Sequence, residues 1–246
     1  MMNRSRRKRN GLRALAVASA CSTLWLSMGV AFADDVAQGK SIATNGVAGQ
    51  APCMACHGAN GEGMAAAGFP FLAGMPAAYL EAQLMDFAEG RRKQPVMEPI
   101  AKTLNAEQKK AVAAWYASLK PVINPARAVQ LQQSYPKGKK GAWLAQRGDW
   151  SRGLPACVQC HGPGGIGVAP TFPALAGQSA TYIKNQLLAW KTGTRAEDVH
   201  GLMAHLAGKL TDEEIESVST YFGNDIGAAT ASVTSAQTPA KAGGQQ

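Results

Sequence analysis

Hydrophobic side chains recur at helical spacing in two segments that resemble each other, residues 76–90 and 179–193. The apolar positions are Tyr79, Leu80, Leu84 and Phe87 in the first and Tyr182, Ile183, Leu187 and Trp190 in the second. This spacing predicts two amphipathic helices. Pro76 suits a first turn, Ser179 is a candidate N-cap, and Gly90 and Gly193 are candidate stops.

A second pair of predicted helices starts at the capping-box sequences Asn105-x-x-Gln108 and Thr211-x-x-Glu214. Apolar side chains follow that we expect in the cores: Val112, Trp115 and Tyr116, then Ile215, Val218, Tyr221 and Phe222. A short helix is also expected over 39–46. The pattern predicts an all-α fold.

These helices belong to a tandem repeat. Residues 39–46 match 141–148, and 69–74 match 172–177, with an offset that grows only from 102 at Gly39 to 106 at Met97. The repeat predicts two copies of one domain, at 34–120 and 141–227. Between them, 121–140 contains three prolines and Gly138 and is interpreted as a linker. Residues 228–246 carry few large apolar side chains and are predicted to form a disordered tail.

The N-terminus has the pattern of a secretory signal peptide. Six basic residues within 4–13 precede the apolar run 14–30, and Ala31-Phe32-Ala33 offers a cleavage site before two aspartates. We expect export to the periplasm with cleavage after Ala33; a retained membrane anchor is the alternative, because the run approaches the length that spans a bilayer.

Cleavage would change the charge of the chain. Residues 1–33 hold 6 of the 25 Lys and Arg and none of the 16 Asp and Glu, so residues 34–246 carry 19 minus 16, or +3. A nucleic-acid partner therefore loses its main support, and none is expected. Peripheral association with a membrane stays open.

The four cysteines after residue 33 form two C-x-x-C-H motifs, Cys53–His57 and Cys157–His161. Disulfides and zinc are the alternatives for exported C-x-x-C pairs. The two pairs lie 104 residues apart, too far for a usual zinc ribbon, and neither alternative requires a histidine after both. C-x-x-C-H is the attachment pattern of c-type haem. We expect two haem c groups, bound through Cys53, Cys56, Cys157 and Cys160, with His57 and His161 as iron ligands.

The repeat also selects candidates for the opposite iron ligand. Of the methionines in the first copy after residue 33, only Met97 matches another methionine, Met203. Met and His together are a usual ligand pair in electron-carrying cytochromes. Met97 is expected in a non-helical loop between Pro95 and Pro99, and His200 and His205 compete with Met203.

Residues around the haem ligands have predicted roles too. A backbone carbonyl near Pro70 and another near Pro173 should accept from the far ring nitrogens of His57 and His161. The basic residues of 91–93 and Arg195 either pair with haem propionates or form a solvated loop.

From residue 34 to about 225 the chain resembles the diheme cytochrome c4 family. The likeness rests on both C-x-x-C-H-G motifs, on Pro-x-Leu-Ala-Gly, on Tyr-x-x-x-Gln-Leu and on residues 97–101. It implies two class I cytochrome c domains around a pseudo-twofold axis, with propionates near the interface. It also implies electron shuttling in the periplasm, often from a cytochrome bc complex to a terminal oxidase.

The expected function is thus single-electron transfer between respiratory redox partners, without catalysis. Two six-coordinate haems would leave no open position for a substrate, which argues against a diheme peroxidase. A haem-carrying subunit of a periplasmic dehydrogenase remains as the alternative. A haem-based sensor would need a fused output domain, and none is visible in the sequence.

Overall fold

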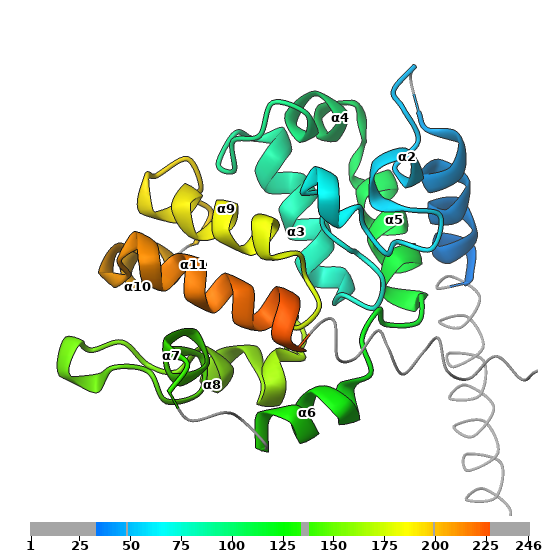
Figure 1. Ribbon diagram of the computed structural model, residues 1–246. Helices are drawn as coiled ribbons and strands as arrows, with labels where there is room; N and C mark the ends of the chain where they lie inside the picture. Colours follow the sequence, from blue (N-terminus) through cyan, green and yellow to red (C-terminus); the bar gives the residue numbers. More distant parts are fainter. Residues whose placement is uncertain (1–32, 48, 134–137, 199, 227–246) are drawn as a thin grey trace, which may run out of the picture.

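The computed structural model describes residues 33–47, 49–133, 138–198 and 200–226. Within these ranges the chain is helical, and β-structure is limited to isolated bridges. The first half contains a helix over 33–45, then α2 (Met54–His57), α3 (Ala77–Ala88), α4 (Met97–Thr103) and α5 (Ala106–Ser118). The second half repeats this order with α7 (Lys140–Arg147), α8 (Cys157–His161), α9 (Ala180–Lys191), α10 (Leu202–Lys209) and α11 (Asp212–Thr220) (Figure 1). The prediction of an all-α fold is confirmed.

The predicted helix starts are confirmed in detail. The Asn105 side chain accepts from the Gln108 N–H at 2.8 Å, and the Gln108 side chain accepts from the Asn105 N–H at 2.9 Å. Thr211 and Glu214 form the same reciprocal pair, at 3.2 and 3.0 Å. Both boxes satisfy N–H groups that a helix leaves unpaired at its first turn.

Each half is closed by its first helix crossing its last helix at a glycine. A Cβ at Gly39 would lie 2.0 Å from the carbonyl oxygen of Ala111, and one at Gly141 would lie 2.0 Å from that of Ser217. Only a residue without a side chain permits this approach of the two backbones. Behind each crossing lies a separate apolar core, one around Tyr116 and the other around Phe222.

The two halves meet through equivalent residues. Arg92 and Arg195, which occupy the same repeat position, form an antiparallel bridge. The Lys93 N–H donates to the Thr194 carbonyl and the Ala196 N–H to the Arg91 carbonyl, both at 2.9 Å. Pairing of equivalent positions in antiparallel fashion is what a pseudo-twofold axis produces.

The segment 121–140, expected to be a linker, contains an additional helix, α6 (Pro125–Gln133). Its Ala128 is fully buried and contacts η3 (Pro163–Gly165) of the second half, where Gln132 accepts a hydrogen bond from the Gly164 N–H. The sequence did not predict this helix, because its stability comes from packing on η3 rather than from a strong local pattern.

Residues 1–32 and 227–246 lie outside the described residues, and with them nearly all of the predicted signal peptide and tail. Among the helices that are described, none is both long and apolar enough to cross a bilayer.

Candidate functional site

A single continuous cavity reaches both C-x-x-C-H motifs. Its wall in the first half includes Cys53, Cys56, His57 and Met97, and its wall in the second half includes the four side chains in the matching positions, Cys157, Cys160, His161 and Met203. The eight side chains that the sequence proposed as haem attachments and iron ligands therefore all line one cavity. The rest of the wall is largely apolar, with Phe71, Leu80, Ile183 and Leu187 among its members.

The histidines at the ends of the short helices α2 and α8 have the same environment. His57 Nδ1 lies 2.9 Å from the Pro70 carbonyl oxygen, and His161 Nδ1 lies 2.8 Å from that of Pro173. A carbonyl can only accept, so each ring carries its proton on Nδ1 and keeps a lone pair on Nε2. The predicted acceptors near Pro70 and Pro173 are confirmed. Such a partner fixes the tautomer and ring orientation of a metal-binding histidine.

Burial favours the neutral form of these histidines. It lowers the pKa of His57 and of His161, although the hydrogen bond to each carbonyl acts in the opposite direction. A neutral imidazole is the form that binds a metal.

No disulfide joins the cysteines of either motif. Before haem attachment, burial raises the pKa of the Cys53 thiol and raises that of the Cys157 thiol to about 11. Within the described residues, no three His, Cys, Asp or Glu side chains gather as they would around an ion held by protein groups alone.

Met97 is placed differently from the prediction. It is the first residue of α4, so the expectation of a non-helical loop between Pro95 and Pro99 is wrong. Pro99 is the third residue of α4. The N–H groups of a first turn have no partner within the helix, so a proline there removes no helical hydrogen bond and does not break the helix. Gln94 Oε1 accepts from the Met97 N–H at 2.8 Å, and Asp198 Oδ2 accepts from the Met203 N–H. Both methionines thus sit at the start of a helix whose first N–H groups are bound by a preceding side chain.

The competing histidines lie elsewhere. His200 and His205 are exposed and do not line the cavity, whereas Met203 is half-buried and does. Among the other methionines of the first half, Met64 and Met85 are 45% and 43% exposed. Met75 also lines the cavity, but Gln178 occupies its repeat position.

Arg92 and Arg195 line the cavity between the two groups and are only 6% and 3% exposed. A solvated loop is therefore the wrong interpretation for these two, while Arg91 and Lys93 are exposed. Gln83 and Gln186 accept hydrogen bonds from both arginines. The repeat matched these glutamines, but nothing in the sequence assigned them a role, since they pair with residues of the other half.

The residues present fit haem c. Two thiols and a histidine with a free Nε2 meet an apolar cavity, and a methionine lines the same cavity in each half. Buried arginines in that wall suit the propionates of the macrocycle.

Comparison with known proteins agrees with this site. Residues 36–120 and 139–224 each match the cytochrome c family. The thiosulfate dehydrogenase electron acceptor of Stutzerimonas stutzeri strain A1501 is 47% identical over 205 residues, which cover 82% of this chain and 91% of that protein. Cytochrome c4 of Pseudomonas aeruginosa is 36% identical over 181 residues, covering 73% of this chain and 86% of the relative.

Solved structures give the same result. A thiosulfate dehydrogenase from Marichromatium purpuratum superposes with a TM-score of 0.68 at 39% identity, covering 77% of this chain and 40% of that one. Reduced cytochrome c4 from Pseudomonas stutzeri gives a TM-score of 0.61 at 31% identity, covering 76% and 96%. The chain belongs to the cytochrome c family, as an electron-transferring diheme protein of the cytochrome c4 type that carries two covalently bound haem c groups.

Proposed function

We propose that this protein is a periplasmic electron carrier that takes single electrons from a thiosulfate dehydrogenase and passes them to respiratory partners. The observation that carries the proposal is the 47% identity to a thiosulfate dehydrogenase electron acceptor across nearly the whole of that relative. The cytochrome c4 relative, at 36%, is more distant. Haem c bound at each motif supplies a reversible one-electron couple.

The residues have equivalent roles in the two halves. Cys53, Cys56, Cys157 and Cys160 form the thioether attachments, and His57 and His161 bind iron through Nε2. Met97 and Met203 would supply the second protein ligand of each iron. Two observations support these two methionines as ligands. Each lines the cavity near the start of a helix, and the backbone N–H of each donates to a side chain. The exposure of His200 and His205 favours Met203 over both.

Two protein ligands at each site would leave no open position for a substrate. This arrangement favours a carrier over a diheme peroxidase. A permanent haem-carrying subunit of a dehydrogenase would use the same residues, and the likeness to part of a thiosulfate dehydrogenase structure is compatible with that alternative. An assay that distinguishes a diffusing carrier from a permanent subunit therefore has to test two things. It must show whether the protein dissociates from the dehydrogenase, and whether it accepts electrons from it.

The cellular location of the protein and the identity of its further partners are part of the same proposal. Residues 1–33 direct export and are removed after Ala33. A terminal oxidase is the proposed downstream acceptor and a cytochrome bc complex a second proposed donor, as the resemblance to the cytochrome c4 family implies.

The test mixes the purified, oxidised holoprotein with a purified thiosulfate dehydrogenase and thiosulfate, and follows reduction of the haem absorbance bands. We expect both haems to be reduced through repeated encounters, at catalytic amounts of the dehydrogenase. No reduction under conditions where ferricyanide accepts electrons from the same enzyme would contradict the proposal. Reduction only in a stoichiometric, inseparable complex would favour the subunit alternative.

Ligand class and haem count come from a potentiometric titration with spectra on the same sample. Two reducible haems of Met/His type are expected, and the reduced protein should not bind carbon monoxide at neutral pH. Rapid stoichiometric binding at one haem would overturn the closed-site assignment.

A further inference from the structure

We propose that a hollow on the second half is the docking surface for a redox protein whose contact face is apolar and rimmed by carboxylates. This tryptophan hollow is lined by Trp143, Trp150, Leu144, Lys139, Arg147 and Arg152, among other residues. The inference rests on the proposed function, because it concerns where a partner of that electron carrier binds.

The two tryptophans are the most exposed large apolar side chains in the described part of the chain. Trp143 is 54% exposed and Trp150 is 65% exposed. Their rings therefore offer a large apolar area to a partner, and burying such area is a main source of binding free energy. Tryptophan is also among the residues that most often dominate the energetics of protein interfaces.

The first half has no tryptophan in the segments equivalent to those that carry Trp143 and Trp150. Ser41 stands in the repeat position of Trp143. From Gly46 to Cys53 is seven positions, whereas from Gly148 to Cys157 is nine, so the loop that carries Trp150 is two residues longer than its counterpart. The core and the candidate haem ligands are shared by both copies, so the tryptophan hollow is not needed for the domain to fold or to hold its cofactor.

The longer loop holds Trp150 in a fixed place. Asp149 and Leu154 form a bridge, with backbone hydrogen bonds at 2.7 and 3.0 Å. The Asp149 carboxylate accepts from Ser151 at 2.6 Å and from Arg152 at 2.7 Å. Arg152 also reaches Glu214 of α11 at 2.8 Å. A loop ordered in this way loses little conformational entropy when a partner binds.

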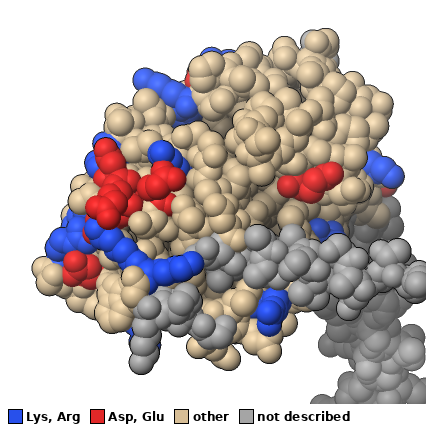
Figure 2. Space-filling model, viewed as in Figure 1, with Lys and Arg blue, Asp and Glu red and all other residues tan. Residues whose placement is uncertain are grey.

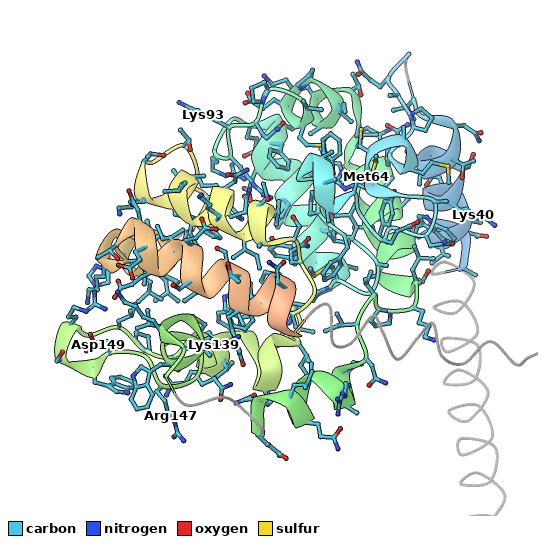
Figure 3. The ribbon with its side chains drawn as sticks, in the orientation of Figure 1. Lys40, Met64, Lys93, Lys139, Arg147 and Asp149 are labelled. Carbon is cyan, nitrogen blue, oxygen red and sulfur yellow. The ribbon has the colours of Figure 1, made fainter. Side chains whose placement is uncertain are left out.

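The charge around the hollow favours an acidic partner. Figure 2 shows charged side chains gathering on the half that carries α9, α10 and α11, with both signs present. Four basic side chains line the hollow, Lys139, Lys140, Arg147 and Arg152, and they outnumber the carboxylates of Asp149 and Glu214. Lys139 and Arg147 lie at opposite ends of α7 (Figure 3). A basic excess at the rim attracts a protein with carboxylates around its contact face and speeds their encounter.

The position of the tryptophan hollow next to the cavity favours a redox protein as the partner. Leu144 lines both the tryptophan hollow and the cavity at the second C-x-x-C-H motif, and it is only 5% exposed. Leu144 thus lies between the tryptophan hollow and the second candidate haem site. Tryptophan with basic residues also suits a membrane surface, but such anchoring would gain nothing from this proximity.

The experiment compares the wild-type holoprotein with the double variant Trp143→Ser/Trp150→Ala, and with Arg147→Glu. Controls are Met85→Ser, which removes an apolar side chain of the first half that is 43% exposed, and Lys120→Glu, a charge reversal two residues beyond α5. Two partners are used, a thiosulfate dehydrogenase with thiosulfate as donor and membranes containing a cytochrome c oxidase as acceptor. Reduction by dithionite, which needs no docking, and thermal unfolding verify that each variant is intact.

We expect the double variant to exchange electrons about tenfold more slowly with at least one partner, since a lost hot spot costs roughly 1.4 kcal/mol or more. Arg147→Glu should slow the same reaction and weaken its dependence on salt, and both controls should match the wild type. Equal rates for the double variant and wild type with both partners would overturn the inference. So would loss of binding to anionic phosphatidylglycerol vesicles with unchanged electron exchange, which would identify a membrane surface instead.

The two proposals fail separately. If the wild type is not reduced by the dehydrogenase, the proposed donor is wrong, and the oxidase arm alone decides whether the tryptophan hollow binds a redox partner.

Discussion

Arg92 and Arg195 hold the same two glutamine side chains from opposite halves of the molecule. Arg92 donates to Gln83 Oε1 at 2.6 Å and to Gln186 Oε1 at 2.5 Å, and Arg195 donates to the same two oxygens at 2.9 Å. The arrangement is pseudo-symmetric, and its four side chains come from two pairs of repeat positions. It joins the halves at the wall of the cavity that connects the two candidate haem sites.

The two buried arginines differ in the groups that compensate their positive charges. Arg195 pairs with Glu197 at 2.5 Å and stacks 3.7 Å from the Trp190 ring centroid. Arg92 lies 4.4 Å from the centroid of the Phe87 ring and donates to the Tyr182 hydroxyl at 2.9 Å. Burial alone would raise the pKa of Tyr182, but the two arginines outweigh it and lower that pKa.

Arg195→Ala should therefore destabilise the protein more than Arg92→Ala. Removing Arg195 strands the buried carboxylate of Glu197, and breaking a buried ion pair costs about 3–5 kcal/mol. Removing Arg92 leaves no carboxylate of its own half unpaired. The free energy of unfolding of each holoprotein variant, measured in urea by circular dichroism, checks this order, with Lys120→Ala as an exposed control. Equal losses for the two arginine variants would show that Glu197 is not held mainly by Arg195.

The repeat made much of this molecule predictable. It placed equivalent helices, both capping boxes and the carbonyl acceptors of His57 and His161, because these depend on local sequence that both copies carry. It could not place Arg92 and Arg195. Their partners lie across the interface, and an arginine two residues after a glycine has the same local pattern in a solvated loop. The assignment of Met97 to a loop failed because two prolines suggested a break, although a proline in the first turn is compatible with a helix.

Met97→Ala and Met203→Ala should each remove half of the sulfur-to-iron charge-transfer absorbance of the oxidised protein. The reason is that each methionine is the proposed sulfur ligand of one haem. His200→Ala and His205→Ala serve as matched controls and should leave the band intact, since both histidines are exposed and away from the cavity. A full band in Met203→Ala, with loss in one histidine variant, would transfer the ligand role to that histidine.

Glu214 should make stability depend on pH in the acid range. Burial would raise its pKa, but hydrogen bonds from Arg152 and the Thr211 N–H outweigh burial and lower it. A carboxyl group whose folded pKa is depressed stabilises the fold above its unfolded pKa, about 4.3, and loses that contribution as pH falls through the folded value. The difference in unfolding free energy between wild type and Glu214→Gln should therefore be largest near neutral pH and shrink on acidification. Glu213→Gln, whose side chain is 79% exposed, should show no such difference, and a constant gap for Glu214→Gln would contradict the assignment.

Gly164→Ala should cost more stability than Gly193→Ala. Both glycines have positive φ, 66° and 74°, so an alanine suffers the same left-handed strain of roughly 1–2 kcal/mol at each position. They differ in what surrounds them. A Cβ at Gly193 meets nothing within 4 Å, whereas one at Gly164 would lie 2.7 Å from the backbone of Ala128 in α6.

The additional loss in Gly164→Ala then measures the docking of α6 on the second half. Thermal unfolding of the two variants gives the difference, and hydrogen exchange should show faster opening of residues 125–133 in Gly164→Ala alone. Equal melting temperatures of the two variants, with unchanged hydrogen exchange in α6, would mean that α6 shifts away from the added Cβ without a loss of stability. In that case the segment between the two repeats would act as the linker that its prolines suggested, despite its helical structure.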